Sequence, residues 1–103
     1  MTLKELKDFF INQPSGKQFN FGLSTPFSWR GSYDEVAFSI EEYESTREDI
    51  LNNINDAYIG AFIGYKGGEY NYSDYTTVNF EEDYSRWSDG SYTMNLLLKL
   101  LFN

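Results

Sequence analysis

The amphipathic stretch of residues 46–59 constrains the fold more than any other part of the sequence. Its apolar residues recur at the spacing of one helix face, and they are Ile50, Leu51, Ile54, Ala57 and Tyr58. Ser45 or Thr46 is suited to cap this helix, because a side-chain hydroxyl accepts a hydrogen bond from a first-turn amide. Gly60 follows the last turn and ends the pattern. The sequence therefore predicts a helix from about 46 to 59.

A second helix is predicted near the N-terminus. Thr2 and Glu5 have the spacing of a capping box, in which each side chain accepts a hydrogen bond from the other residue's amide. The apolar residues beside them recur at helical spacing and are Leu3, Leu6, Phe9 and Phe10. The segment Pro14-Ser15-Gly16 then ends the helix.

Four further segments are typical of strands, because they alternate or concentrate β-branched, aromatic and other apolar residues. They are residues 18–23, 33–40, 76–81 and 92–102. Residues 24–31 and 62–75 are expected to be loops. The leucine-rich segment 92–102 fits a buried strand or a short helix, and we favour the strand because the turn-forming residues 88–91 precede it.

This order of elements, helix, strand, strand, helix, strand, strand, predicts a single α+β domain that covers residues 1–103. We expect a small antiparallel sheet of about four strands with both helices packed on one face. A sheet this small and this rich in aromatic residues tends to leave an apolar edge or patch exposed. A homodimer or a higher homo-oligomer is therefore expected.

The absence of cysteine and histidine removes most of the chemistry of small enzymes. The chain has no residue that supplies a thiolate or an imidazole as ligand, nucleophile or base. Its acidic runs at 41–42, 48–49 and 81–83 lack the spacing of a calcium-binding loop. We therefore expect no catalytic residues, no metal and no cofactor, and interpret the chain as a protein that is not an enzyme.

The sequence carries no signal for a membrane. No apolar run is long enough to span a bilayer, and Glu5 and Asp8 interrupt the stretch where a signal peptide would be apolar. We therefore expect a soluble, cytoplasmic protein that does not bind membranes.

The net charge of −8 is concentrated in the middle of the chain. Residues 34–89 contain 14 of the 16 acidic residues against three basic residues, which gives this segment a net charge of −11. Such a field repels nucleic-acid backbones, so direct binding of DNA or RNA is not expected. The same carboxylates can instead imitate nucleic acid toward a basic protein.

Two short segments combine glycines, aromatic residues and single cations, and are predicted to form two walls of one ligand-binding site. The first contributes Trp29, Arg30, Gly31 and Tyr33, and the second contributes Tyr65, Lys66, Gly67, Gly68 and Tyr70. The cations would hold an anion, the rings would stack on it, and the glycines would offer backbone amides. Each segment alone also fits an ordinary turn with a surface cation beside an aromatic ring. The second segment lacks the spacing of a P-loop, so nucleotide hydrolysis is not expected.

The order of these motifs resembles a widespread family of small bacteriophage proteins with an FDFG-like strand, a SWRGSY loop and a GYKGGEY loop. The matching residues are Phe19-Asn20-Phe21-Gly22, Ser28-Trp29-Arg30-Gly31-Ser32-Tyr33 and Gly64-Tyr65-Lys66-Gly67-Gly68-Glu69-Tyr70. Asn20 stands where an acidic residue is expected in the first motif. The resemblance extends over residues 18–80 and implies a counter-defence role in an infected bacterial host.

Two functions fit this resemblance. In the first, which we favour from the sequence, the chain is a sponge that sequesters a small anionic immune signal, a cyclic nucleotide or an ADP-ribose derivative, without catalysis. In the second, it is an acidic, anti-CRISPR-like inhibitor that binds a basic host defence protein by nucleic-acid mimicry. The two motif loops would then be structural.

Overall fold

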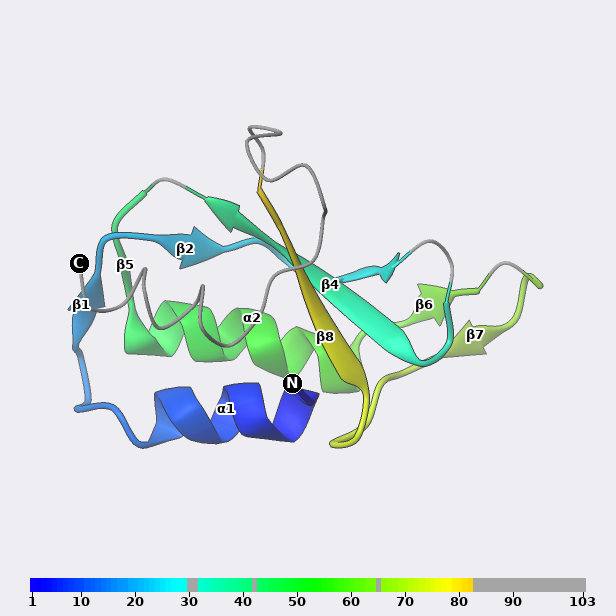
Figure 1. Cartoon of the computed structure of the whole chain (residues 1–103), viewed down its shortest axis with the longest axis horizontal. Helices are drawn as coiled ribbons and strands as arrows, with labels where there is room; N and C mark the ends of the chain where they lie inside the picture. Colours follow the sequence, from blue (N-terminus) through cyan, green and yellow to red (C-terminus); the bar gives the residue numbers. More distant parts are fainter. Residues whose placement is uncertain (30–31, 42, 65, 83–103) are drawn as a thin grey trace.

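The computed structural model describes residues 1–29, 32–41, 43–64 and 66–82 (Figure 1). Within these residues the chain forms two helices and eight strands. In chain order they are α1 (Leu3–Ile11), β1 (Gln18–Phe19), β2 (Gly22–Leu23), β3 (Phe27–Ser28), β4 (Glu35–Glu41), β5 (Ser45–Thr46), α2 (Arg47–Ile59), β6 (Phe62–Ile63), β7 (Glu69–Tyr70) and β8 (Thr77–Glu82). The fold is α+β, as predicted.

β4 is the centre of the largest sheet, because it is hydrogen-bonded along both of its edges. One edge pairs antiparallel with β2 and β3, and the other pairs with β8 from Glu35 opposite Thr77 to Ile40 opposite Glu82. The side chains on one face of β4 are buried, and they are Val36, Phe38 and Ile40. The predicted strand over 33–40 is therefore confirmed, with its bounds shifted to 35–41.

β2 and β3 are the two halves of one partner strand, interrupted by a bulge. Leu23 lies opposite Ile40, whereas Phe27 lies opposite Ala37, so four steps along β2–β3 match three steps along β4. The interruption contains Pro26, which has no amide to donate to the ladder. The expectation of a loop over 24–31 was wrong at β3, because the proline breaks the strand pattern.

β8 confirms the predicted strand over 76–81, but it runs parallel to β4 and so corrects the expected antiparallel sheet. After β4 the chain forms α2 and the β6–β7 hairpin, and it returns to the end where β4 begins. The alternating burial of Val78 and Phe80 fits either strand direction, so the sequence carries no signal for it. The other edge of β8 takes up the N-terminal residues, where the Val78 amide donates to the Met1 carbonyl at 2.9 Å.

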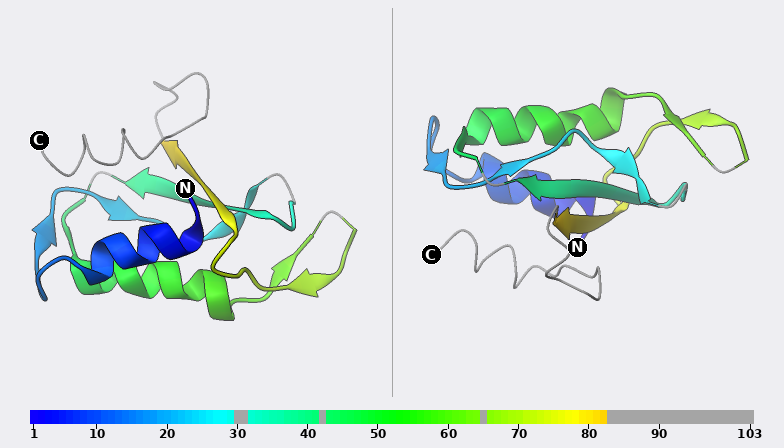
Figure 2. Two further views of the ribbon diagram at one scale, coloured as in Figure 1. Left: turned by 60° about the horizontal axis from the view of Figure 1, so that its bottom comes forward. Right: turned by 90° about the horizontal axis from the view of Figure 1, so that it is seen from above.

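Both helices pack against one face of this sheet (Figure 2). The buried side chains that meet there are Leu3, Leu6 and Phe10 of α1, Ile50, Ile54 and Ala57 of α2, Val36, Phe38 and Ile40 of β4, and Val78 and Phe80 of β8. Helical and alternating spacing predicted these apolar faces, and the structure confirms them.

Each helix begins at a capping box. The Thr2 hydroxyl accepts a hydrogen bond from the Glu5 amide at 3.2 Å, and the Glu5 carboxylate accepts one from the Thr2 amide at 2.9 Å. These bonds lower the pKa of the Glu5 carboxyl. Thr46 and Asp49 form the same reciprocal pair at α2, and Gly60 ends that helix. Both predicted helices are thereby confirmed at their N-terminal caps.

Arg47 caps the C-terminal end of α1 from a distant part of the chain. Its Nε donates to the Phe10 carbonyl at 2.9 Å and its Nη2 donates to the Ile11 carbonyl at 3.0 Å. These carbonyls belong to the last turn of α1, which has no basic residue of its own. The guanidinium therefore satisfies the helix end and places a positive charge at the negative end of its dipole.

Two other predicted segments differ from the structure. Residues 18–23 do not form one strand, because β1 pairs with β5 while β2 pairs with β4. Residues 62–75 were expected as a loop but contain the β6–β7 hairpin. In both cases the strands are two residues long, which is too short for a periodic pattern. The predicted turn 88–91 and strand 92–102 lie outside the described residues.

Replacing Arg47 should destabilise the fold, because the last carbonyls of α1 lose their hydrogen-bond donors. Arg47→Ala removes two charged hydrogen bonds and should lower the free energy of unfolding by about 1.5–3 kcal/mol. Arg47→Lys keeps the charge without the planar fork and should recover only part of this loss. Urea unfolding measures both changes.

The matched control is Lys4→Ala, because Lys4 pairs with Asp8 on the same helix but in an exposed position. This variant should change the free energy of unfolding by less than about 1 kcal/mol. Equal losses for Arg47→Ala and Lys4→Ala would contradict the capping role of Arg47.

Candidate functional site

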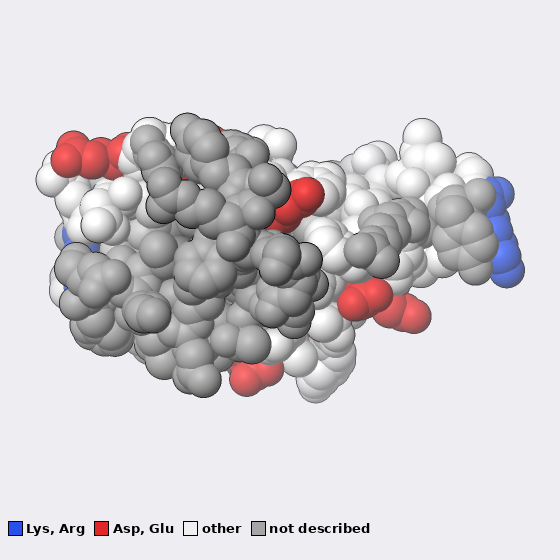
Figure 3. Space-filling view, turned by 45° about the horizontal axis from the view of Figure 1, so that its top comes forward, with Lys and Arg blue, Asp and Glu red and all other residues white. Residues whose placement is uncertain are grey.

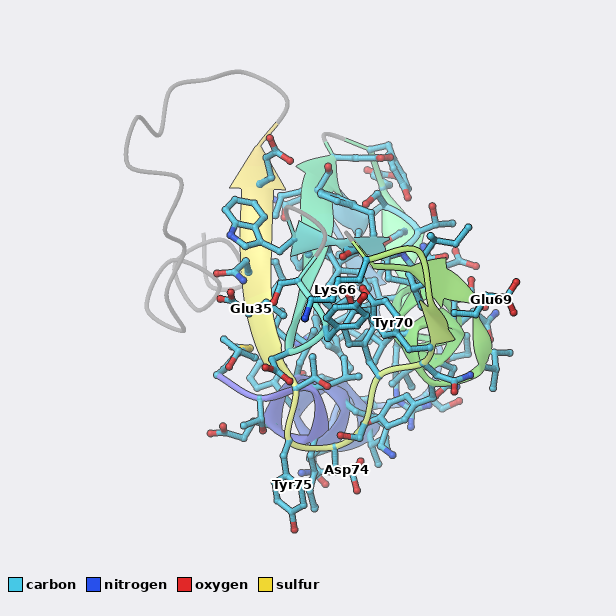
Figure 4. All side chains as sticks on the ribbon, turned by 90° about the vertical axis from the view of Figure 1, so that its right-hand side faces the viewer. Glu35, Lys66, Glu69, Tyr70, Asp74 and Tyr75 are labelled. Atoms are coloured by element: carbon cyan, nitrogen blue, oxygen red, sulfur yellow. The ribbon has the colours of Figure 1, made fainter. Side chains whose placement is uncertain are left out.

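The two motif segments meet at one end of the molecule, where the β6–β7 hairpin lies beside β3 (Figure 4). The rings of Tyr33 and Tyr70 contact each other with centroids 4.8 Å apart. The Lys66 amide donates a hydrogen bond to the Tyr33 hydroxyl at 3.1 Å. The structure therefore brings three of the predicted site residues together from the two loops.

Gly64 and Gly67 are required for different reasons. A methyl group on Gly64 would lie 2.2 Å from Cε1 of Tyr33, so the tyrosine ring occupies the space of a side chain. Gly67 has a φ of +86°, in the region that glycine adopts without strain. Gly68 is constrained by neither effect, because a methyl group there would meet nothing within 4 Å.

The Ser32 carbonyl is the centre of a cluster of hydroxyl groups that joins the hairpin to the first motif. Its oxygen lies 2.9 Å from the Tyr70 hydroxyl, 3.0 Å from the Tyr72 hydroxyl and 3.1 Å from Oγ of Ser28. The two tyrosine hydroxyls are 2.8 Å apart, and Tyr70 also lies 2.8 Å from Oγ of Ser28. Such a mutually bonded polar cluster fixes the relative position of the segments that contribute to it. We call these contacts between the first motif, the β6–β7 hairpin and Tyr72 the joint.

Aromatic packing surrounds this cluster on the hairpin side. The Phe62 ring lies 4.8 Å from the Tyr72 ring, and the rings of Tyr70 and Tyr72 are 5.1 Å apart in an edge-to-face arrangement. Tyr72 is 4% exposed. Burial, together with the hydrogen bond to Tyr70, raises the pKa of the Tyr72 phenol, so its hydroxyl remains protonated well above neutral pH.

The amides of the hairpin turn are largely engaged within the joint. The Gly67 amide donates to the Gly64 carbonyl at 2.8 Å, and the Gly64 amide donates to the Gly68 carbonyl at 3.1 Å. The Lys66 amide is bonded to Tyr33. Lys66 and Gly68 themselves are exposed on the outer side of the turn. Lys66 of the turn is therefore exposed, whereas most of the described amides of the turn form hydrogen bonds within the protein.

The remaining predicted site residues are placed only in part. Trp29 is half-buried, and its carbonyl accepts a hydrogen bond from the Ser32 amide at 2.8 Å. Arg30, Gly31 and Tyr65 lie outside the described residues. The convergence of Arg30 and Lys66 on one concavity therefore stays a prediction.

The predicted ligand-binding residues leave out four residues that build this joint. They are Ser28, Ser32, Phe62 and Tyr72. The alternation of Tyr72 with Tyr70 fits a stacking or hydrogen-bonding surface and equally an ordinary strand face. Ser32 contributes through its carbonyl, which every residue type has, so no sequence signal for this contact exists.

Shallow pockets open on the described surface, and two of them lie outside the contact between the motif loops. One has a volume of about 210 Å³ and is lined by Ala61, Glu69, Tyr70 and Asn71. The other has a volume of about 180 Å³ and is lined by Gln18, Glu44, Ser45, Thr46 and Asp49. Both are smaller than the roughly 300–1,000 Å³ that is usual for small-molecule sites, and both contain carboxylates that would repel an anion.

In the part of the chain that the structure describes, no three acidic side chains come close enough together to hold a metal ion. Neither α1 nor α2 is long and apolar enough to cross a membrane.

No protein-family model matches the sequence, and no curated protein and no solved structure is significantly similar to it. The resemblance to small phage proteins therefore stays a prediction from the motifs.

Alanine substitutions at Gly64 and Gly68 compare a glycine packed against a ring with a glycine that has no atom nearby. Gly64→Ala forces a methyl group into the Tyr33 ring and should lower the free energy of unfolding by roughly 1–3 kcal/mol. Gly68→Ala is the matched control and should change it by less than about 0.5 kcal/mol, because its methyl group meets no atom. Urea unfolding of both variants tests this, and equal effects would contradict the packing of Tyr33 on Gly64.

The buried Tyr72 should make the fold sensitive to alkaline pH. Its phenol titrates near pH 10 in the unfolded chain and above that in the folded chain, so its contribution is complete below about pH 10 and is lost as pH rises. The free energy of unfolding should then fall by up to about 1.4 kcal/mol per pH unit for this one proton. Tyr72→Phe should remove this part of the slope in urea titrations between pH 9 and 11. Parallel curves for the variant and the wild type would contradict the assignment.

Proposed function

We propose that this chain is a non-catalytic binding protein that docks, through its acidic surface, on a basic protein. The observation that carries this proposal is that the motif loops are bonded to each other. Tyr33, Tyr70 and the amides of Gly64 and Gly67 contact other residues of the same joint. These groups act as structural parts, which is what the inhibitor hypothesis requires of the loops.

The acidic surface supports a protein partner. Between described residues the salt bridges are Lys4–Asp8, Lys7–Asp74 and Arg47–Glu48. Six exposed carboxylates take no part in them. Glu5 and Asp49 accept capping hydrogen bonds, and the other four are Asp34, Glu44, Glu69 and Glu81. Figure 3 shows red carboxylates over several parts of the visible surface, whereas blue appears chiefly at the outer end of the hairpin. Such a distribution attracts basic protein surfaces and repels nucleic acid.

The phage resemblance suggests a class for this partner. A defence nuclease carries a basic channel that binds nucleic-acid phosphates, and spaced carboxylates can occupy the same positions. In this proposal the chain blocks the channel by charge mimicry, which needs neither a deep pocket nor a catalytic group. The pockets of about 210 Å³ and 180 Å³ are consistent with binding through a surface.

A second candidate function is the sequestration of a small anionic ligand, a cyclic nucleotide or an ADP-ribose derivative. It is favoured by the outer side of the hairpin turn, where Lys66 is exposed next to Gly67 with its φ of +86° and the open Gly68. In this proposal Arg30 would add a second cation to Lys66, and the exposed turn would change its backbone conformation to offer amides. This function requires the joint to open, because the Gly67 amide is engaged.

Removing carboxylates tests the first function. Glu44→Gln/Glu81→Gln takes the net charge from −8 to −6 and should weaken inhibition of a purified basic defence nuclease about tenfold at low salt. A panel of such nucleases is assayed for cleavage of labelled nucleic acid with and without the protein. For the wild type, inhibition should fall steeply as salt rises, because screening weakens exposed charge pairs.

The matched control is Asn12→Lys/Asn55→Lys, which reaches the same net charge at exposed positions without removing a carboxylate. It should weaken inhibition less than the Glu44→Gln/Glu81→Gln variant. The wild type is also titrated calorimetrically with cyclic dinucleotides, cyclic trinucleotides and ADP-ribose isomers. Absence of inhibition, together with tight ligand binding that Arg30→Ala weakens at least tenfold, would replace the first function by the second.

A further inference from the structure

The turn of residues 73–76, between β7 and β8, is held by hydrogen bonds on both sides of Tyr75. The Thr76 amide donates to the Ser73 carbonyl at 3.1 Å, and the Ser73 amide donates to the Thr76 hydroxyl at 3.0 Å. These reciprocal bonds close a four-residue turn whose third residue is Tyr75. The backbone that carries this tyrosine is therefore ordered before any partner binds.

The ends of both helices hold the same turn. The amides of Leu3 and Lys4, in the first turn of α1, donate to the carbonyls of Thr76 at 2.8 Å and Asp74 at 3.0 Å. Near the end of α2, the Tyr58 hydroxyl donates to the Asp74 carboxylate at 2.8 Å. The residues on either side of Tyr75 are therefore fixed to the body of the molecule.

Tyr75 itself is the most exposed large hydrophobic residue of the described chain, at 83%. Figure 4 shows its side chain pointing away from the body of the molecule. Its ring and hydroxyl make no hydrogen bond or ring contact with another described residue. The packing of the described fold therefore does not account for an aromatic side chain at this position.

We propose that Tyr75 is the anchor of a protein–protein interface and inserts into a recess on a partner protein. Tyrosine is among the residues that carry most of the binding energy in interfaces. A turn that is already ordered also loses little conformational entropy on binding. This proposal rests on the proposed function for the charge of the partner, which is a basic protein whose recess is lined by apolar residues.

Other classes of partner fit Tyr75 less well. A nucleic-acid base stacks on tyrosine, but the net charge of −8 repels the phosphates beside it. A membrane surface requires a broad apolar face, whereas Tyr75 is a single exposed ring on a narrow turn next to Asp74. A recess on a folded protein accommodates a single projecting ring.

Photo-crosslinking of the full chain tests this interface. Benzoylphenylalanine is placed at position 75, or at position 11 as the control, and bacterial cells that express either variant are irradiated. Ile11 is also apolar and exposed, at 46%, but it lies at the opposite end of α1 from the turn. We expect a protein adduct that forms at position 75 and not at position 11.

The captured protein is then purified and titrated with defined variants. Tyr75→Ala should weaken its binding at least tenfold, and Tyr75→Phe, which keeps the ring, should stay within about threefold of the wild type. The thermal unfolding of Tyr75→Ala should match that of the wild type, because the ring is exposed. A loss of affinity without a loss of stability supports the proposal.

Three results would overturn it: no adduct above that at position 11, an adduct between two copies of this chain, or unchanged affinity of Tyr75→Ala. The proposed function is tested separately on the same captured protein. If Tyr75→Ala weakens binding but Glu44→Gln/Glu81→Gln and salt do not, the anchor stands and the acidic docking fails. If only the carboxylates and salt matter, the anchor fails and the acidic docking stands.

Discussion

The pairing of β4 on both edges is the constraint on which the rest of the structure depends. One edge holds the bulged strand β2–β3, the other holds β8, and its buried face receives both helices. β3 and the start of β4 also flank the first motif, so the position of Ser32 follows from the sheet. The hairpin then binds to a carbonyl whose place is already set. A change in the register of β4 would displace the core and the joint together.

The parts of the fold that the sequence predicted are those whose signals are local. The helices follow from capping boxes three residues apart and from apolar spacing within a few turns. Strand direction, the bulge at Pro26 and the two-residue strands depend on residues far apart in the chain, and alternating burial does not encode them. Arg47 illustrates the difference, because its role at the end of α1 joins residues that are 36 and 37 positions apart.

The candidate site shows the same division. The two glycine-aromatic segments could be recognised from composition, and the structure brings them into contact. Their chemistry could not be predicted, because Gly64 is explained only by the Tyr33 ring that fills its place. The Ser32 carbonyl has no residue-specific signature at all. Glycines and tyrosines that suggest a ligand pocket in isolation can therefore be complementary halves of a structural joint.

The bonds between the N-terminal residues and the segment at the start of β8 affect when the chain can complete its fold. The first turn of α1 bonds to Asp74 and Thr76, and Met1 bonds to Val78. During synthesis, residues 1–4 leave the ribosome well before residues 74–78, so these bonds form only after both segments have emerged. Until then α1 can form its capping box but cannot pack against the complete sheet. High sequence separation of this kind slows folding, and it leaves the apolar face of α1 open to other proteins while the chain is incomplete.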